Sequence, residues 1–392
     1  MTPEELRRQM HDETLAAQRA QWAARAAEEE DRTRRIVLTP ASAIAPRPVR
    51  WLWDTTPPGE FPTSHGRIPM DAVSLAGGPP GVGKSQFAAW IAAKVTTGKL
   101  YGHLYGQPRD VVYAATEDSW AHTIVPRLIA VGADLERVHR IAVVDETIAR
   151  TTTVTLPVDV IRLGKVMQEN GAKLFIADPL ISLLDGKIND NRSTEIREAV
   201  QPLVDAADRF EFSVLGLMHF TKNGGADPLA RISGSGAFGQ LVRAAIAFAR
   251  DDSDEDDRKS SCVMSQIKNN LGRLDLPSLE YEIESSVVNS EEGSCYSSKL
   301  RFAGNSATSV RDILRDQADG RDFARADARL WLVAHLAELG GSVPAPDALK
   351  AGAAAGFSRA TMYRVRKDLG IVSRLSAGRS PFATWYLPEA AP

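Results

Sequence analysis

The feature that most constrains this chain is a glycine-rich run, Gly78-Pro79-Pro80-Gly81-Val82-Gly83-Lys84-Ser85. Its spacing is G-x-x-x-x-G-K-[ST], the pattern of a phosphate-binding P-loop. The apolar segment 72–76 before it predicts a buried strand, and apolar residues at helical spacing continue after it to Val95. A glycine loop between a strand and a helix leaves several backbone N–H groups unpaired at the positive end of the helix. The run therefore predicts a strand–loop–helix unit that binds a nucleoside triphosphate.

We expect the P-loop and the residue after it to surround the phosphates. These residues are Gly78, Pro79, Pro80, Gly81, Val82, Gly83, Lys84, Ser85 and Gln86. The ammonium group of Lys84 is expected at the β- and γ-phosphates, and the hydroxyl of Ser85 is an oxygen ligand of the kind that Mg²⁺ prefers. The expected cofactors are therefore ATP and Mg²⁺.

Length and composition restrict the class of protein. A chain of 392 residues is long enough for two or three domains, and its net charge of −3 gives no global sign of nucleic-acid binding. The two cysteines, Cys262 and Cys295, have no disulfide or zinc-site pattern. No apolar run approaches the roughly 18 residues that span a membrane, and the charged N-terminus is unlike a secretory signal. We expect a soluble cytoplasmic protein that has no membrane segment.

Strand and helix patterns alternate after the P-loop. Strands are expected near 110–115, 139–144, 173–177 and 212–219, with helices near 119–131, 156–170 and 193–209. Continuous apolar strands separated by helices predict an α/β fold, in which a mostly parallel sheet has helices on both faces. Four later strands, near 243–250, 261–268, 278–285 and 298–302, have no helices between them. We expect these four as antiparallel additions at one edge of the sheet.

The chain divides into four expected parts. Residues 1–35 read as a polar helix, and residues 36–302 as the α/β domain with a proline-rich lead-in. Residues 303–324 are expected to be a linker, and residues 325–392 a compact helical unit.

Hydrolysis needs a carboxylate beside the Mg²⁺ and a group that activates water. Asp178 follows the apolar strand 173–177, at the edge where the carboxyl ends of parallel strands meet a ligand, so we expect it to support the metal. Glu117 follows the strand 110–115 and is expected to orient the attacking water. Asp118 is an alternative for that role, although it also suits the N-cap of the next helix.

His219 closes the strand 212–219, which we expect beside the P-loop strand. A lone histidine at a strand end is often structural. A polar side chain at this position is nevertheless well placed to respond to the γ-phosphate, and we expect His219 to act as a sensor.

The C-terminal unit has its own pattern. Three helices are expected, at 327–339, 347–354 and 358–369, and residues 371–387 are expected to form a β-wing. On the third helix one face is apolar, and the opposite face carries Arg359, Tyr363, Arg366 and Lys367. Residues 356–387 hold six basic residues against one acid. The unit looks like a winged helix-turn-helix that binds duplex DNA, and the alternative is a basic helix in a protein-docking domain.

Several motifs together give the chain a resemblance to a known family. They are the P-loop, the strand-end Glu117, Asp178-Pro179, the pair His219 and Lys222, the loop 233–238 and the segment 266–272. In these motifs residues 45–302 resemble the RecA-fold ATPases of the RepA type, an AAA-like group of hexameric replicative helicases of plasmids and phages. This group is related to the DnaB-type and RadA/KaiC-type families.

The resemblance implies a role for each matching residue. Lys84, Glu117 and His219 would be catalytic, and Ser85 and Asp178 would hold Mg²⁺. Lys268 matches the position of a finger residue that reaches the nucleotide of the neighbouring subunit. An arginine stabilises transition-state charge better, so Arg243 and Arg273 are alternatives for this finger.

A site completed by a neighbour implies an oligomer, and the resemblance favours a hexameric ring. Single-stranded DNA would pass through its channel and contact the loop 221–235 through Lys222 and Arg231. The alternative is that this glycine-rich loop is only a surface loop.

The function expected from these observations is an ATP-dependent motor on DNA, as in a ring helicase of a plasmid, phage or mobile element. Two alternatives stay open. One is a DNA-dependent ATPase of the recombinase or repair class, and the other is a nucleotide-switched DNA-binding regulator or loader that does not unwind DNA.

Overall fold

The computed structural model describes residues 37–60, 65–145, 150–189, 192–221, 225–232, 236–251, 261–357, 359–375 and 383–387. The chain divides into two compact units, 1–48 and 49–392. The described part of the first unit contains a short 3-10 helix, Ala41–Ala43. The helix expected over 1–35 lies outside the described residues.

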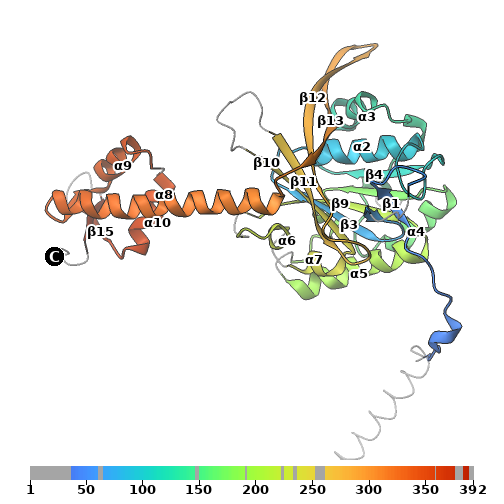
Figure 1. Ribbon diagram of the computed structural model, residues 1–392, viewed down its shortest axis with the longest axis horizontal. Coiled ribbons are helices and arrows are strands. Elements are labelled where there is room, and N and C mark those ends of the chain that lie inside the picture. Colours follow the sequence, from blue (N-terminus) through green and yellow to red (C-terminus); the bar gives the residue numbers. More distant parts are fainter. Residues whose placement is uncertain are drawn as a thin grey trace, which may run out of the picture. The chain divides into compact units, whose positions relative to one another are not determined.

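One large sheet organises the second unit (Figure 1). Its strands follow the order β13-β12-β11-β10-β3-β9-β8-β4-β5. Their bounds are β3 Val73–Gly78, β4 Val111–Ala115, β5 Val138–Arg140, β8 Leu174–Asp178, β9 Ser213–His219, β10 Ala244–Asp251, β11 Ser261–Asn269, β12 Ser278–Ser290 and β13 Gly293–Ser306. Neighbouring strands from β10 to β5 pair in parallel, and β11, β12 and β13 are antiparallel additions. The predicted α/β class is confirmed.

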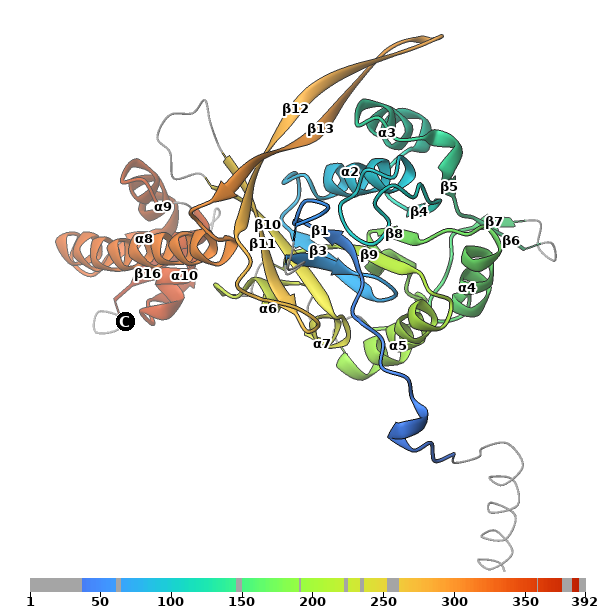
Figure 2. The same cartoon turned by 45° about the vertical axis from the view of Figure 1, so that its right-hand side comes forward.

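Helices cover both faces of this sheet (Figure 2). On one face lie α2 (Lys84–Thr96) and α3 (Val125–Ala130), and on the other α4 (Val160–Glu169) and α5 (Ser193–Arg209). The central strand β3 is buried along its whole length because both of its faces are covered, which explains its continuous apolar sequence. The helix predicted over 119–131 is a π-helical turn, Trp120–Ile124, followed by α3.

The prediction that all four later strands are antiparallel is wrong for β10. This strand pairs in parallel with β3, with Ala244 opposite Ser74. The segment that contains α6 (Pro228–Arg231) and α7 (Ala237–Leu241) carries the chain from the end of β9 back to the other end of the sheet. Such a crossover connection is what a parallel strand requires.

The hairpin of β12 and β13 is longer than the sequence predicts. Only Leu279–Tyr281 of β12 pair with β11. In contrast, β12 and β13 pair along their whole lengths, from Ser278 opposite Ser306 to Ser290 opposite Gly293. Its outer part extends beyond the sheet past α2 and α3, as Figures 1 and 2 show.

Shorter elements flank the sheet. The proline-rich lead-in forms an antiparallel pair, β1 (Trp51–Asp54) with β2 (Gly66–Pro69). The strand predicted over 139–144 is divided between β5 and a separate strand β6 (Val143–Asp145), which pairs with β7 (Arg150–Thr152).

The linker expected over 303–324 is not found, since Ser306 ends β13 and α8 runs from Val310 to Glu338. The side chain of Ser309 caps α8, and Asp312 bonds back to complete a capping box. Val310, Ile313 and Leu314 pack with residues of β10 and β11. The start of this helix therefore belongs to the packing of the sheet.

The C-terminal residues form helices and a small sheet. The elements are β14 (Ser342–Pro344), α9 (Ala345–Ala354), α10 (Arg359–Asp368), β15 (Val372–Leu375) and β16 (Ala383–Tyr386). The strands pair in the order β14-β16-β15. Leu332, Leu336, Val343, Met362 and Trp385 belong to one buried cluster.

None of the described helices combines the length and the apolar character that crossing a membrane requires.

Candidate functional site

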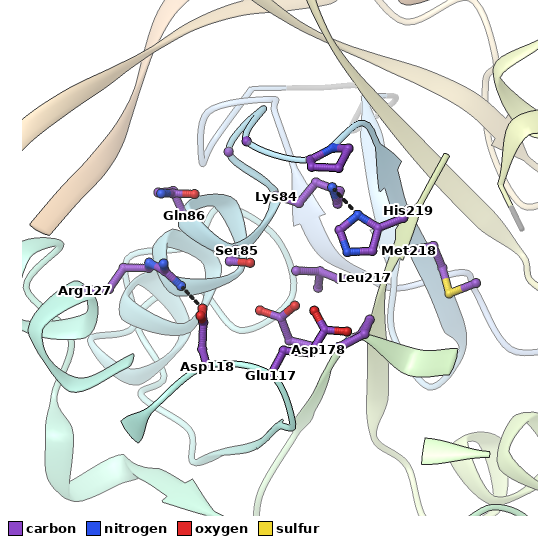
Figure 3. Close-up of a pocket in the computed structure, with 14 residues that line it drawn as sticks. Lys84, Ser85, Gln86, Glu117, Asp118, Arg127, Asp178, Leu217, Met218 and His219 are labelled. Atoms are coloured by element: carbon purple, nitrogen blue, oxygen red, sulfur yellow. Dashed lines mark hydrogen bonds and ion pairs between the residues drawn. The ribbon is translucent and has the colours of Figure 1, made fainter. Parts of the chain in front are cut away.

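The carboxyl ends of four adjacent parallel strands meet at one cavity of about 250 Å³ (Figure 3). Gly78 at the end of β3 lies opposite His219 at the end of β9, and Ala115 at the end of β4 lies opposite Asp178 at the end of β8. Glu117, Asp178 and His219 line this cavity together with five P-loop residues, Pro80, Gly81, Gly83, Lys84 and Ser85. Residues far apart in the sequence are thus brought together in the way that parallel strands predict.

The P-loop depends on two glycines in the left-handed region of backbone conformation, Gly81 with φ of 75° and Gly83 with φ of 100°. A Cβ atom on Gly83 would also lie 2.7 Å from the Cδ1 atom of Ile283 on β12. The hydroxyl of Tyr281, on the same strand, donates a hydrogen bond to the carbonyl oxygen of Val82 at 2.5 Å. Strand β12 therefore supports the back of the loop, which fixes the positions of its backbone N–H groups.

Lys84 is buried inside the loop. Its ammonium group donates to the carbonyl oxygens of Gly78 at 2.9 Å and Pro79 at 2.8 Å, and it lies 3.4 Å from Nδ1 of His219. Burial lowers the pKa of Lys84 to about 8, against the opposing effect of the Asp178 and Glu117 carboxylates. A phosphate group beside this ammonium would favour its charged form.

Asp178 has two hydroxyl groups near it. Tyr113 of β4 donates to its Oδ2 at 3.0 Å, and Ser85 of the P-loop lines the same cavity. Burial raises the pKa of Asp178, and the neighbouring Ser85 and Tyr113 hydroxyls oppose that shift. A hydroxyl and a carboxylate oxygen side by side fit Mg²⁺, which prefers oxygen and usually keeps several waters or phosphate oxygens as further ligands.

Glu117 and Asp118 are adjacent in sequence but differ in environment. Glu117 is exposed at the cavity and lies beside Asp178 in Figure 3. Asp118 accepts an ion pair from Arg127 of α3, with Nη1 and Oδ2 3.2 Å apart. The expectation that Asp118 caps the following helix is wrong, because the side chain of Ser119 accepts the bond from the His122 N–H.

The structure adds residues that the sequence did not indicate. Arg127, Leu217 and Met218 line the cavity, and Tyr113 holds Asp178. These side chains belong to helices or strand interiors without a motif, so only the position of Met218 next to His219 could have pointed to them.

Gln86 also lines the cavity, and its amide donates to the hydroxyl of Ser298 on β13 at 3.0 Å. The β12–β13 hairpin is therefore bonded to the first turn of α2 as well as to the P-loop.

The residues considered for a trans-acting finger lie at the opposite end of the sheet. The backbone N–H of Arg243 donates to the carbonyl oxygen of Val73, the first residue of β3, and Lys268 is opposite Ala245. The carbonyl oxygen of Arg273 accepts from the side chain of Asn269, which is opposite Ala244. Gly78 is five positions after Val73, which is about 16 Å along a strand. None of these cations can therefore reach the cavity of its own subunit.

These cations differ in their contacts. The Lys268 ammonium donates to the carbonyl oxygens of Gly239 at 2.6 Å and Gln240 at 3.4 Å, and burial lowers its pKa. Arg273 makes two hydrogen bonds to Asp275. The exposed side chain of Arg243 makes no hydrogen bond or ion pair with another described residue.

The residues expected to contact DNA are placed unevenly. Arg231 is only 8% exposed, and its Nε donates to the Gly225 carbonyl oxygen at 2.5 Å, so its expected exposure to a channel is wrong for this conformation. Lys222 lies outside the described residues, as does part of the loop 233–238.

On α10 the side chains of Tyr363 and Lys367 are exposed. Arg366 is half-buried, and its guanidinium lies over the ring of Trp385, 5.8 Å from the centroid. The expectation that Arg366 belongs to the solvent-facing side chains of this helix is therefore wrong. Arg359 lies in the first turn of this helix.

The site has a P-loop between a buried strand and a helix, a strand-end carboxylate in the same cavity as the P-loop serine, and a second acid. These features define a P-loop ATPase. Comparison of sequences is consistent with this class. The family model described as an AAA domain matches residues 26–225, which is half of the chain. The chain belongs to this AAA domain family.

Other comparisons give weaker similarity. One solved structure, an ATPase domain, is 16% identical, with a TM-score of 0.41, and the match covers 53% of this chain and 81% of that domain. A KaiC-like protein from the hyperthermophilic archaeon Pyrococcus horikoshii OT3 is 15% identical, with a TM-score of 0.43, and the match covers 64% of this chain and 99% of that protein. No curated protein sequence matches the chain at a significant level.

Proposed function

We propose that this ATPase is a motor that acts on DNA, a ring helicase of the RepA type that hydrolyses ATP at sites shared between subunits. The observation that carries the proposal is the separation of the cavity from Arg243, Lys268 and Arg273, which occupy the other end of the sheet. A cation that cannot reach the nucleotide site of its own subunit is suited to contact the nucleotide of a neighbouring copy.

Within one subunit, each group at the cavity has a proposed task. Lys84 and the P-loop N–H groups bind the phosphates of ATP, and Ser85 and Asp178 hold Mg²⁺, which would neutralise charge on the β- and γ-phosphates. Glu117 accepts a proton from, and orients, the attacking water. His219, at 3.4 Å from the Lys84 ammonium, would respond when the γ-phosphate leaves.

The transition state of phosphoryl transfer needs a further positive charge. Arg127 carries the one guanidinium among the described residues that line the cavity, and it is paired with Asp118. We therefore propose that the charge comes from the neighbouring subunit, and that Arg243 supplies it. Lys268 is engaged with backbone carbonyls and Arg273 with Asp275, whereas Arg243 is exposed and its guanidinium suits bidentate phosphate contact.

Repeated around a ring, this arrangement requires a head-to-tail contact between copies, which closes as a hexamer in our proposal. Single-stranded DNA would pass along the loop at 221–235, with Lys222 as a phosphate contact. The C-terminal residues would form a winged helix-turn-helix domain that contacts duplex DNA through Arg359, Tyr363 and Lys367 of α10.

The test combines ATP turnover with strand displacement. Turnover should rise when single-stranded DNA is added, and a forked duplex should be unwound, while Glu117→Gln should abolish both. Stimulated turnover without unwinding would favour a recombinase or loader. If no nucleic acid changes the rate of ATP turnover, the motor function is contradicted and the nucleotide-switched regulator is the remaining alternative.

A further inference from the structure

A second cavity, of about 420 Å³, lies on the α2 face of the sheet, away from the nucleotide site. Its lining includes Trp53, Trp90, Lys94, Lys99, Tyr101 and Tyr105. Trp90, the lining residue of α2 nearest the P-loop, follows Lys84 by six residues, so the cavity begins about 9 Å along the helix from the P-loop lysine. Among the described residues that line it there is no carboxylate.

Aromatic rings are open to solvent at this cavity. Tyr101 and Tyr105 are 40% and 46% exposed, and their ring centroids are 5.4 Å apart in an edge-to-face arrangement. The backbone beneath them is fixed, since the N–H of Asp54 donates to the Tyr101 carbonyl oxygen at 2.9 Å. Two exposed rings on a fixed backbone form a preorganised stacking surface.

The two lysines give this surface its positive charge. The Nζ atom of Lys94 lies 5.9 Å from the centroid of the Trp90 ring, a cation–π distance. Lys99 is exposed, three residues after the end of α2. Exposed aromatic faces beside ammonium groups match a ligand that has both flat bases and phosphates.

We propose that this cavity, the Tyr101–Tyr105 pocket, binds a single strand of nucleic acid outside the ring channel. Bases of the strand stack on Tyr101 and Tyr105, and the phosphates beside them pair with Lys94 and Lys99. The inference rests on the proposed function, because a displaced single strand is the partner that such a motor would supply. A free nucleotide shares the same chemistry, and the test separates the two sources.

The first experiment measures binding of labelled oligothymidine to the full-length protein saturated with ADP. The double variant Tyr101→Ala/Tyr105→Ala should weaken the affinity for the strand by roughly ten- to a hundredfold, as expected for lost base stacking. The variant Lys94→Gln/Lys99→Gln should lower the slope of log affinity against log salt by about 1.4, because each phosphate contact contributes about 0.7 for a single strand.

The control variant is Tyr296→Ala/Lys165→Ala, which removes an exposed tyrosine on β13 and an exposed lysine on α4. It should bind oligothymidine as the wild type does. Equal loss in control and pocket variants would overturn the proposal. Thermal unfolding and ADP affinity should be the same for all variants, which separates loss of the site from loss of the fold.

The second experiment uses a strand that carries 5-iodouracil, followed by irradiation and peptide mapping. Cross-links should appear in the peptides that contain Tyr101 or Tyr105, and excess thymidine monophosphate should not remove them. If cross-links appear only in other segments while DNA still stimulates turnover, the proposal for this pocket is wrong and the proposed motor function is not affected. If thymidine monophosphate competes as well as the strand does, the ligand of this pocket is a free nucleotide and not a single strand. Absence of any binding or stimulation would reject both proposals.

Discussion

The hydroxyl of Tyr113 donates a hydrogen bond to the carboxylate of Asp178 at 3.0 Å, from one parallel strand to its neighbour. Asp178 is half-buried at the cavity, and burial raises its pKa, so the donors around it decide how well it keeps its charge. Because Mg²⁺ binds the charged form, this buried tyrosine is a positioning residue for the proposed metal site.

Tyr113→Phe should therefore weaken the response to Mg²⁺. Loss of a group that orients a metal ligand typically lowers metal affinity by about 10- to 100-fold. The pKa of Asp178 should rise further, because its charged form loses a donor, so turnover at low pH should be lost at a higher pH than in the wild type. Turnover measured against Mg²⁺ concentration and pH tests both effects.

Thr96→Val is the control for this variant. It also removes one buried hydroxyl, but that hydroxyl lies at the far end of α2 and donates to the carbonyl oxygen of Ala93 at 3.2 Å. Both variants should lose about 1 kcal/mol of unfolding free energy, and only Tyr113→Phe should change the Mg²⁺ dependence. An unchanged Mg²⁺ response in Tyr113→Phe would contradict the role of the tyrosine.

Binding of ATP should take up a proton at mildly alkaline pH. The pKa of Lys84 is about 8 because burial disfavours its charge, and nearby phosphates would raise it again. Above pH 8 the free protein has lost part of this proton, and the complex regains it, so the affinity for ATP should fall as pH rises. Calorimetry in buffers with different ionisation enthalpies measures the uptake directly.

Lys84→Arg keeps its charge throughout this pH range and provides the control. Its proton uptake near pH 8.5 should disappear. The same uptake in the wild type and in this variant would show that another group is responsible.

The same pKa has a consequence for stability. The folded-state pKa of Lys84 lies below its ordinary value of 10.5, so the unfolded chain binds more protons between about pH 8 and pH 10.5. The contribution of this residue to stability should therefore increase with pH across that window. Urea unfolding of the wild type and of Lys84→Met at several pH values measures the difference, and parallel pH profiles would contradict it.

Glu117 and Asp118 should differ sharply when their charge is removed. Glu117→Gln should lower kcat by about 10² to 10⁴, the usual contribution of a general base, with little change in ATP affinity. Asp118→Asn should cost less than about tenfold, since that carboxylate is paired with Arg127. Turnover and nucleotide affinity of both variants decide the assignment, which would be reversed if Asp118→Asn were the more damaged.

Gly83→Ala and Gly81→Ala separate backbone strain from packing. Both positions have positive φ, which costs roughly 1–2 kcal/mol for a side chain, but only at Gly83 would the new methyl group meet Ile283. Gly83→Ala should therefore unfold at a lower urea concentration and lose more ATP affinity. Equal effects of the two substitutions would show that β12 does not support the P-loop as described.

The local signals in the sequence were sufficient for the parallel sheet. The P-loop and the strand-end acids gave the positions of Gly78, Glu117 and Asp178 because strand alternation puts their carboxyl ends at one edge. The direction of β10 and the length of the β12–β13 hairpin were not predictable, since strand pairing depends on distant segments. The same limit applied to Arg127 and Tyr113, which enter the site only through tertiary packing.

The charge of a residue and its position in a helical pattern do not predict how exposed its side chain is. The sequence pattern predicts solvent-facing side chains for Arg231 and Arg366. In the structure Arg231 bonds to the carbonyl oxygen of Gly225, and Arg366 lies over the ring of Trp385. An arginine has a long apolar stem that can cover neighbouring rings, so its charge does not guarantee an outward side chain.

A mixing experiment with Lys84→Ala and Arg243→Ala tests directly whether the ATP site is shared between subunits. Each variant alone should hydrolyse ATP poorly, because one lacks the phosphate-binding lysine and the other the finger for its neighbour. In a mixed ring, about one interface in four joins an intact P-loop to an intact Arg243, so an equal mixture should recover about a quarter of wild-type turnover. A mixture that is no more active than its two components would contradict a site shared between subunits.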